Sequence, residues 1–179
     1  MRKVIISLAV VFFVVSISSA SIAAEVYGIG IQEWGIYDTG KAEKAIKENG
    51  LAPGTSVFIG DIKLLKLTYK IPARLGTSFG LKYYVNGHPP GAQVNITQRW
   101  LFPYPGVKHP ETGKLTHYYD ETELIPIGHT IQGNYLIAWS GFAVQKFTEA
   151  SDLVPGQWTL QLWHGGKKLK EKTFTIYEP

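Results

Sequence analysis

Cysteine is absent from the 179 residues of this sequence. The chain therefore has no disulfide, no cysteine ligand for a metal and no cysteine nucleophile. Its folded stability must come from the burial of apolar surface alone. Small exported domains of animals usually carry disulfides, so a cysteine-free exported chain of this length fits a bacterial envelope or periplasm better.

Net charge is also small. Lysine and arginine together number 18 and aspartate and glutamate 14, which gives a formal net charge of +4. Arg2 and Lys3 lie in the N-terminal segment, and without them the balance is 16 against 14, or +2. A surplus of this size does not indicate binding to nucleic acid or to an anionic membrane surface.

Long apolar runs are missing except near the N-terminus. The run from Val4 to Val15 follows two basic residues, has the length of a signal-peptide core and is too short to span a membrane. We predict a signal peptide over residues 1–24, cleaved after Ala24 or, as the second choice, after Ala23; an uncleaved anchor is the alternative. Residues 25–179 then form one exported domain, periplasmic or extracellular, with no stable membrane insertion after cleavage.

The last stretch of the chain predicts a β-hairpin around which the domain is organised. Pro155 with Gly156 is a turn signal, and Gly165 with Gly166 suits a tight two-residue turn. Between these turns, apolar residues recur at every second position, which is the period of a strand with one buried face. The apolar residues of this strand are Trp158, Leu160 and Leu162.

The expected hairpin register places Leu162 opposite Leu169. The other face then carries Trp163 and three lysines: Lys168, Lys170 and Lys172. Because Phe174 would fall on this lysine face, we infer a bulge near Lys172 and Thr173 that exchanges the two faces. The lysines form either a basic binding strip or a solvated face that keeps a strand edge from pairing with other chains, and the second interpretation is favoured.

Alternating apolar residues and turn signals divide the remaining chain into further strands. Strands are expected in the segments 25–38 (with a bulge near Gln32 and Glu33), 57–71, 79–85, 92–102, 115–119, 135–139 and beyond 142. Residues 42–48 suit two helical turns with too little apolar surface for a core helix. About eight strands without βαβ spacing predict an all-β, antiparallel, immunoglobulin-like sandwich of about seven to eight strands; a closed barrel is the alternative.

Two motifs resemble a known family. Ile71 to Leu81 reads IPARLGTSFGL, and Leu153 to Trp158 reads LVPGQW. Together with Glu33 to Tyr37 and the ending from Lys168 to Phe174, they resemble a family of exported bacterial proteins catalogued only as a domain of unknown function. The resemblance covers nearly the whole of residues 25–179. It implies a bacterial signal peptide and a small all-β domain, and it implies no activity and no site residues.

Catalytic and metal-binding motifs are not found in the sequence. There is no G-x-S-x-G nucleophile elbow, and none of the five histidines is spaced as H-x-H or H-x-x-x-H. The one histidine set worth testing is His109, His117 and His129. Asp120, Glu121 and Glu123 are interpreted as a solvated loop. We therefore predict a protein that is not an enzyme and has no metal or cofactor.

Aromatic residues are abundant, at 13% of the chain. Four tryptophans are in phase with aliphatic residues and are expected in the core: Trp34, Trp100, Trp139 and Trp158. Four other aromatic residues are candidates for an exposed binding surface: Trp163, Tyr104, Tyr118 and Tyr119. Lys168 and Lys170 are added to this binding set, and the alternative is that the rings pack on loops or sheet edges.

Five residues are assigned structural roles: Arg74, Pro72, Pro155, Gly156 and Trp158. Arg74 lies in an apolar run, where a buried guanidinium can join loop carbonyls or a carboxylate. The leading hypothesis is a non-enzymatic, exported module that binds a protein or glycan of the bacterial envelope. The alternatives are an inhibitor or accessory domain of an envelope hydrolase, acting through the loop from Pro103 to Gly113, and an enzyme with a convergent site.

Overall fold

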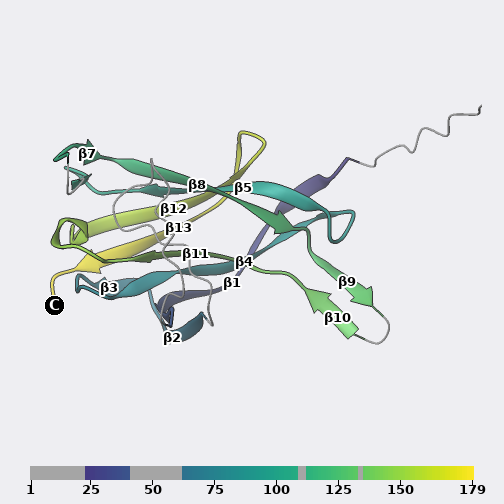
Figure 1. Cartoon of the computed structure of the whole chain (residues 1–179), viewed down its shortest axis with the longest axis horizontal. Coiled ribbons are helices and arrows are strands. Elements are labelled where there is room, and N and C mark those ends of the chain that lie inside the picture. Colours follow the sequence, from purple (N-terminus) through teal and green to yellow (C-terminus); the bar gives the residue numbers. More distant parts are fainter. Residues whose placement is uncertain (1–22, 41–61, 109–111, 133–134) are drawn as a thin grey trace, which may run out of the picture.

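A computed structural model describes residues 23–40, 62–108, 112–132 and 135–179 (Figure 1). The strands are β1 (Glu25–Asp38), β2 (Lys63–Leu67), β3 (Lys70–Pro72), β4 (Ser78–His88), β5 (Gln93–Leu101), β6 (Val107–Lys108), β7 (Leu115–Thr116), β8 (Tyr118–Pro126), β9 (His129–Gln132), β10 (Tyr135–Ala138), β11 (Gly141–Lys146), β12 (Gly156–His164) and β13 (Lys167–Tyr177). A 3₁₀ turn, η1, covers Ala150–Asp152. No helix in this described part is long and apolar enough to cross a membrane.

Two sheets form the body of the domain. The four-stranded sheet has the order β11-β4-β1-β2, and the five-stranded sheet has the order β3-β13-β12-β5-β8. Two small hairpins, β6-β7 and β9-β10, extend from them (Figure 1). All pairs in the two sheets are antiparallel except β3 with β13. The fold-class prediction is confirmed, and because the sheets remain separate, the sandwich is correct and the closed barrel is not.

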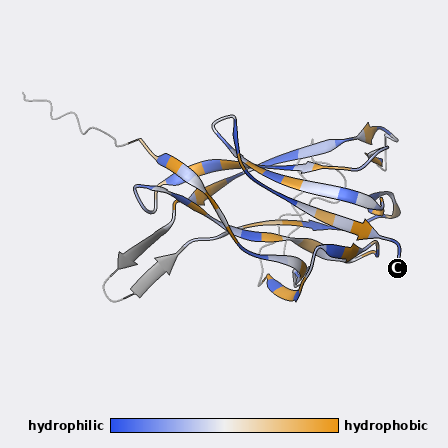
Figure 2. Ribbon diagram, turned by 180° about the vertical axis from the view of Figure 1, so that it is seen from behind, coloured by the Kyte–Doolittle hydropathy of each residue, from blue (hydrophilic) through white to orange (hydrophobic). Residues whose placement is uncertain are grey.

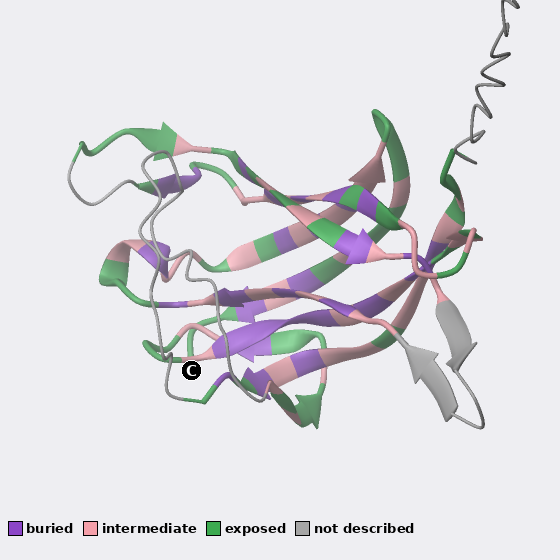
Figure 3. Cartoon of the chain, turned by 45° about the vertical axis from the view of Figure 1, so that its right-hand side comes forward, coloured by how far each residue is buried: buried purple, intermediate pink, exposed green. Residues whose placement is uncertain are grey.

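The core lies between the two sheets and follows from the alternation of each strand. Figure 2 shows hydrophobic and hydrophilic residues alternating along the strands, and Figure 3 shows buried residues recurring along the strands of both sheets. Phe79 of β4 is fully buried and packs against three rings of the facing sheet, at centroid distances of 5.6 Å to Trp100, 5.8 Å to Trp158 and 5.5 Å to Phe174. Inward-facing residues of β5 are buried as predicted: Val94, Ile96, Gln98 and Trp100.

Glycines in the strands permit close approach between neighbouring strands. A Cβ atom on Gly80 would lie 1.9 Å from the carbonyl oxygen of Ala143, so only glycine lets β4 pair with β11 at this point. A Cβ on Gly30 would meet the ring of Tyr84 at 2.2 Å. The predicted bulge in β1 is confirmed, since the register with β4 shifts between Ile31 and Glu33.

The terminal hairpin is confirmed, but its predicted register is wrong. Leu162 pairs with Lys170 and Trp163 with Lys168, so the bulged residue is Leu169 and not one near Thr173. This bulge separates the lysines. Lys168 shares the outer face with Trp163, whereas Lys170 and Lys172 lie on the inward side of β13, at the rim of the core.

Lys172 shows how a charge is accommodated at that rim. Its Nζ lies 4.2 Å from the ring centroid of Trp34 and 4.5 Å from that of Tyr69. These two rings stack on each other at 5.2 Å. A cation above aromatic faces is electrostatically favoured while the aliphatic stem covers apolar surface. The ammonium group therefore closes the rim between the two sheets, and the prediction that Lys172 lies on a plain solvated face is wrong.

Two further segments differ from the sequence-based expectation. The expected strand 57–71 is broken: β2 belongs to the four-stranded sheet and β3 to the five-stranded one, and Leu65 and Leu67 are 60% and 58% exposed. The acidic segment expected to be a loop is instead the middle of β8. The expected signal peptide (except Ala23 and Ala24), the 42–48 helix and residues 57–61 lie outside the described residues.

Candidate functional site

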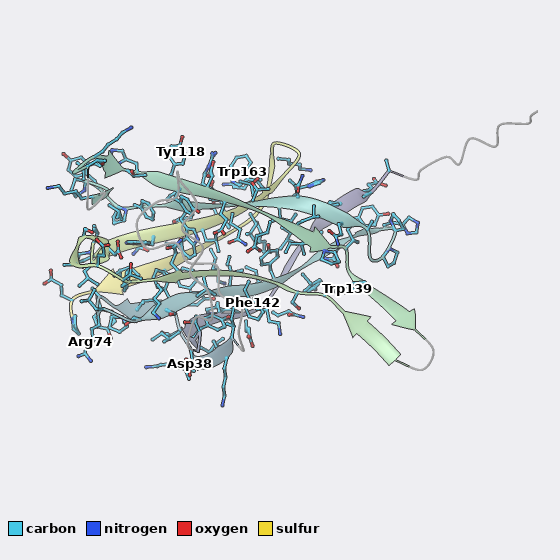
Figure 4. All side chains as sticks on the ribbon, viewed as in Figure 1. Asp38, Arg74, Tyr118, Trp139, Phe142 and Trp163 are labelled. Carbon is cyan, nitrogen blue, oxygen red and sulfur yellow. The ribbon has the colours of Figure 1, made fainter. Side chains whose placement is uncertain are left out.

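An arginine held between two aromatic rings lies on the outer face of the five-stranded sheet, the face turned away from the core. The guanidinium carbon of Arg99 (β5) lies 5.0 Å from the ring centroid of Tyr118 (β8) and 5.4 Å from that of Trp163 (β12). Figure 4 shows Tyr118 and Trp163 on the same side of the molecule. Cross-strand register explains this arrangement, because alternate residues of three adjacent strands point outward together.

Asp120 fixes the position of this guanidinium. Nε and Nη2 of Arg99 donate hydrogen bonds of 2.7 and 2.6 Å to the two carboxylate oxygens of Asp120, which faces it across the β5-β8 ladder. These hydrogen bonds raise the pKa of Arg99 above its ordinary value. Such a bidentate pair fixes orientation as well as charge. We refer to Tyr118, Arg99, Asp120 and Trp163 as the Arg99 cluster.

Polar side chains around the Arg99 cluster bond to one another across the strands. Nε1 of Trp163 donates to Oε1 of Gln161 at 3.1 Å, and Nε2 of Gln161 donates to Glu171 at 3.2 Å. Glu171 also forms an ion pair of 2.7 Å with Lys168. Hydroxyl pairs join further strands: Thr97 with Thr122 and Thr159 with Thr173, each at 2.9 Å. The result is a pre-ordered, charge-balanced face.

The predicted binding residues do not all lie on this face. Trp163, Tyr118 and Lys168 do, and Tyr118 is 54% exposed. Tyr104 is 91% exposed but lies in the loop after β5, at a distinct position. Tyr119 is only 6% exposed because it points into the core opposite Trp100, so the prediction that it is a surface residue is wrong. Lys170 is exposed on the other side of β13, so its assignment to the Trp163 face is also wrong.

The predicted structural residues have mixed outcomes. Trp158 is buried, and its Nε1 donates to the carbonyl of Val154 at 2.9 Å, which confirms it as core. Gly156 has a φ of +131°, and a Cβ there would lie 2.7 Å from Pro103, which supports its structural role. Arg74 is exposed, so the prediction of a buried guanidinium is wrong. Pro72 ends β3, and Pro155 is exposed just before β12.

Sequence reasoning missed Arg99 and Asp120. Arg99 stands between Gln98 and Trp100, which are both buried, so its outward position could have been predicted from the alternation of β5. The outward position of Asp120 could have been predicted only if the acidic segment had been recognised as a strand. The pairing of the two depends on the β5-β8 register, which residue patterns do not specify.

Comparison with known proteins places the chain in a family. Residues 25–176 match the family model described as "Domain of unknown function (DUF3859)". The chain belongs to this family. No curated protein matches this DUF3859 domain. Among solved structures, it is similar to an immunoglobulin-like protein from Pseudomonas aeruginosa, with a TM-score of 0.55 and 24% sequence identity over 88% of this chain and 99% of that chain. This likeness supports the fold and no activity.

A second polar cluster of the DUF3859 domain lies between the sheets. Nε2 of Gln98 donates to Oε2 of Glu123 at 2.9 Å, to the carbonyl of Phe142 at 3.1 Å and to the hydroxyl of Tyr83 at 3.4 Å. Burial, together with the charge of Glu121, raises the pKa of Glu123 from 4.5 to about 7. Burial also raises the pKa of Tyr83. Glu123 is therefore a half-buried carboxyl on an edge strand, and its assignment to a solvated loop is wrong.

The proposed histidine set does not form a described site. His109 and the side chain of His129 lie outside the described residues, and His117 is exposed. Within the described residues of this DUF3859 domain, no group of three or more histidines and carboxylates is placed to hold a metal ion. His164 contacts the backbone, with Nδ1 at 2.9 Å from the carbonyl of Asn95. The Arg99 cluster is thus the strongest candidate for a functional surface.

Proposed function

We propose that this DUF3859 domain is an exported, non-enzymatic interaction module that binds a protein of the bacterial envelope through the outer face of its five-stranded sheet. The observation that carries this proposal is the Arg99 cluster, with its guanidinium held between Tyr118 and Trp163. Binding energy at protein interfaces concentrates in tryptophan, tyrosine and arginine. A glycan is the other ligand class that aromatic residues suit.

Pre-ordering of the face supports a protein partner over a glycan. Arg99 lies against both rings, so the ring surfaces on which a sugar would stack are partly occupied. Ring edges, the Asp120 carboxylate and threonine hydroxyls remain to contact a partner. Because these groups already hold one another in place, little side-chain entropy is lost on binding.

Export is part of the same proposal. The first described strand, β1, begins at Glu25, immediately after the predicted cleavage site. The family match begins at the same residue. Both observations support residues 1–24 as a segment separate from the fold. N-terminal sequencing of the protein recovered from the periplasm of an expressing bacterium tests this: Glu25 as the first residue is expected, and an intact Met1 would contradict it.

The test of the binding face is chemical crosslinking of residues 25–179 in the envelope fraction of the source organism, read by mass spectrometry. We expect one enriched protein that is lost with Trp163→Ala and kept with Tyr27→Ala. Tyr27 is a suitable control because its side chain is 65% exposed on the other sheet. Equal recovery by both variants would contradict the proposal, and binding only to a glycan array would favour the glycan.

A second candidate function rests on Tyr104. This ring is 91% exposed in the loop between β5 and β6, as expected for a residue that inserts into a partner. It supports the alternative of an inhibitor or accessory domain of an envelope hydrolase. Loss of partner recovery with Tyr104→Ala but not with Trp163→Ala would favour this alternative.

A further inference from the structure

The two edges of the five-stranded sheet carry opposite charge. At one edge, β8 holds three acidic residues and no lysine or arginine: Asp120, Glu121 and Glu123. At the other edge, β13 holds four lysines and one glutamate: Lys167, Lys168, Lys170, Lys172 and Glu171. Both strands are edge strands over these residues in the described part of the sheet, because β3 pairs only with Thr175–Tyr177 of β13.

Strand direction allows these edges to meet in two copies of the chain. β8, β5, β12 and β13 are successively antiparallel, so β8 and β13 run in opposite directions. When a second copy is placed beside the first in the same orientation, its β8 can pair with β13 in an antiparallel ladder. The inward sides of both strands then lie on the same side of the joined sheet.

One register matches the charges on that inward side. It places Tyr119 opposite Phe174, Glu121 opposite Lys172 and Glu123 opposite Lys170. Moving the register by two residues one way leaves Lys172 as the only lysine opposite a glutamate, Glu123. Moving it the other way brings Lys170 opposite Glu121, but it also places Asp120 opposite Glu171, so like charges meet. On the outward side the charge-matched register pairs Asp120 with Thr173 and Thr122 with Glu171, so no like charges meet. Opposite charges directly across a ladder stabilise pairing, and like charges oppose it.

We propose that this protein associates head to tail with further copies of itself, through pairing of Tyr119–Glu123 of one copy with Lys170–Phe174 of the next. The lysines prevent two β13 edges from pairing with each other, as lysines on edge strands generally do. They still accept the acidic β8 edge. Such a contact is heterologous and does not close on itself, so it extends the sheet and repeats the Arg99 cluster along one face.

The proposal is independent of the identity of any envelope partner. Its test needs only purified protein, so failure to find a partner and failure to self-associate are separate results. A short ladder with two ion pairs is a small interface, so the association is weak and depends on ionic strength.

Disulfide trapping tests the register directly, because the chain has no cysteine of its own. Thr122 and Glu171 face each other in the proposed ladder, within disulfide reach, and both are exposed. A mixture of the Thr122→Cys and Glu171→Cys variants should form the mixed dimer at least about tenfold faster than a mixture of Thr122→Cys with Lys108→Cys, which lies outside the ladder. Equal rates in the two mixtures would overturn the proposal.

Charge reversal tests the same contact without a crosslink. Sedimentation of the wild type at low salt should show an average mass that rises from about 10 µM to about 1 mM protein, and that falls to the monomer mass at high salt. Glu121→Lys and Lys170→Glu should each abolish this rise, whereas the matched control Glu178→Lys should keep it. The double variant Glu121→Lys with Lys172→Glu should restore it. A monomer at every concentration, or association unaffected by the edge variants, would overturn the proposal.

Discussion

Replacement of Glu123 by glutamine should stabilise the protein, and only at neutral and alkaline pH. Burial raises the pKa of this carboxyl from 4.5 to about 7, so the folded state binds a proton more tightly than the unfolded state. Stability then falls as pH rises between these two values and is level above them. Each pKa unit corresponds to about 1.4 kcal/mol, so the full penalty is roughly 3 kcal/mol as an upper value.

Glutamine keeps the shape of the side chain and the oxygen that accepts from Gln98, and it has no charge to bury. Urea unfolding followed by tryptophan fluorescence should therefore show Glu123→Gln more stable than wild type by about 2–3 kcal/mol at pH 8 and nearly equal to it at pH 4.

Glu171→Gln is the matched control. Glu171 is exposed, and its ion pair with Lys168 lowers its pKa. Because its pKa is lowered, Glu171 contributes folding stability that is present at neutral pH and is lost only as the pH falls through its folded pKa. The Glu171→Gln control should therefore gain no stability at pH 8. An unchanged stability of Glu123→Gln at pH 8, or the same gain at pH 4 and pH 8, would refute the reasoning.

Three other predictions concern the core, the strand pairing and the outer face. Phe79→Ala removes a fully buried ring with four aromatic neighbours and should cost about 3–5 kcal/mol in urea unfolding, whereas a cost below about 1 kcal/mol would contradict the described core. Gly80→Ala forces a Cβ against the Ala143 carbonyl and should lower the melting temperature far more than Gly28→Ala, whose Cβ would meet nothing within 4 Å; equal effects in calorimetry would refute the β4-β11 register. Trp163→Ala should cost only about 1 kcal/mol of folding stability, because the ring lies on the outer face; a loss above about 3 kcal/mol would show that it belongs to the core.

Alternation was sufficient to predict most of the sandwich. In β5, the buried residues Ile96 and Trp100 recur at the period of two that a half-buried strand requires. The bulge near Gln32 was predictable for the same reason, because the apolar parity changes at that residue. Gly165 and Gly166 located the terminal turn because glycine accepts positive φ angles, and in the structure their φ angles are +54° and +77°.

Several residues near the open rims of the sandwich were predicted wrongly. Glu123 and Lys172 point inward at the two edges of the five-stranded sheet, where a charged group can reach solvent or a polar partner past the core. An inward-facing charged residue interrupts the apolar alternation, so the sequence of β8 resembled that of a loop. The bulge at Leu169 was misplaced because an apolar residue is itself the inserted one.

The Arg99 cluster depends on contacts between strands distant in sequence. Trp163 could be selected as a candidate because it lies outside the aliphatic phase of its strand, and Tyr118 because it lies beside the proline-rich loop. Their approach to one arginine follows from β5 lying between β8 and β12. That order is a property of the whole sheet, and no local pattern encodes it.

The dissociation constant of the crosslinked partner, measured by calorimetry with purified proteins, tests the central claim most directly. Removal of a central aromatic anchor costs about 2 kcal/mol or more, so Trp163→Ala should raise the dissociation constant by about 30-fold or more. Tyr27→Ala should leave it within about twofold. Equal constants for the wild type and both variants would contradict the assignment of the outer face of the five-stranded sheet as the binding surface.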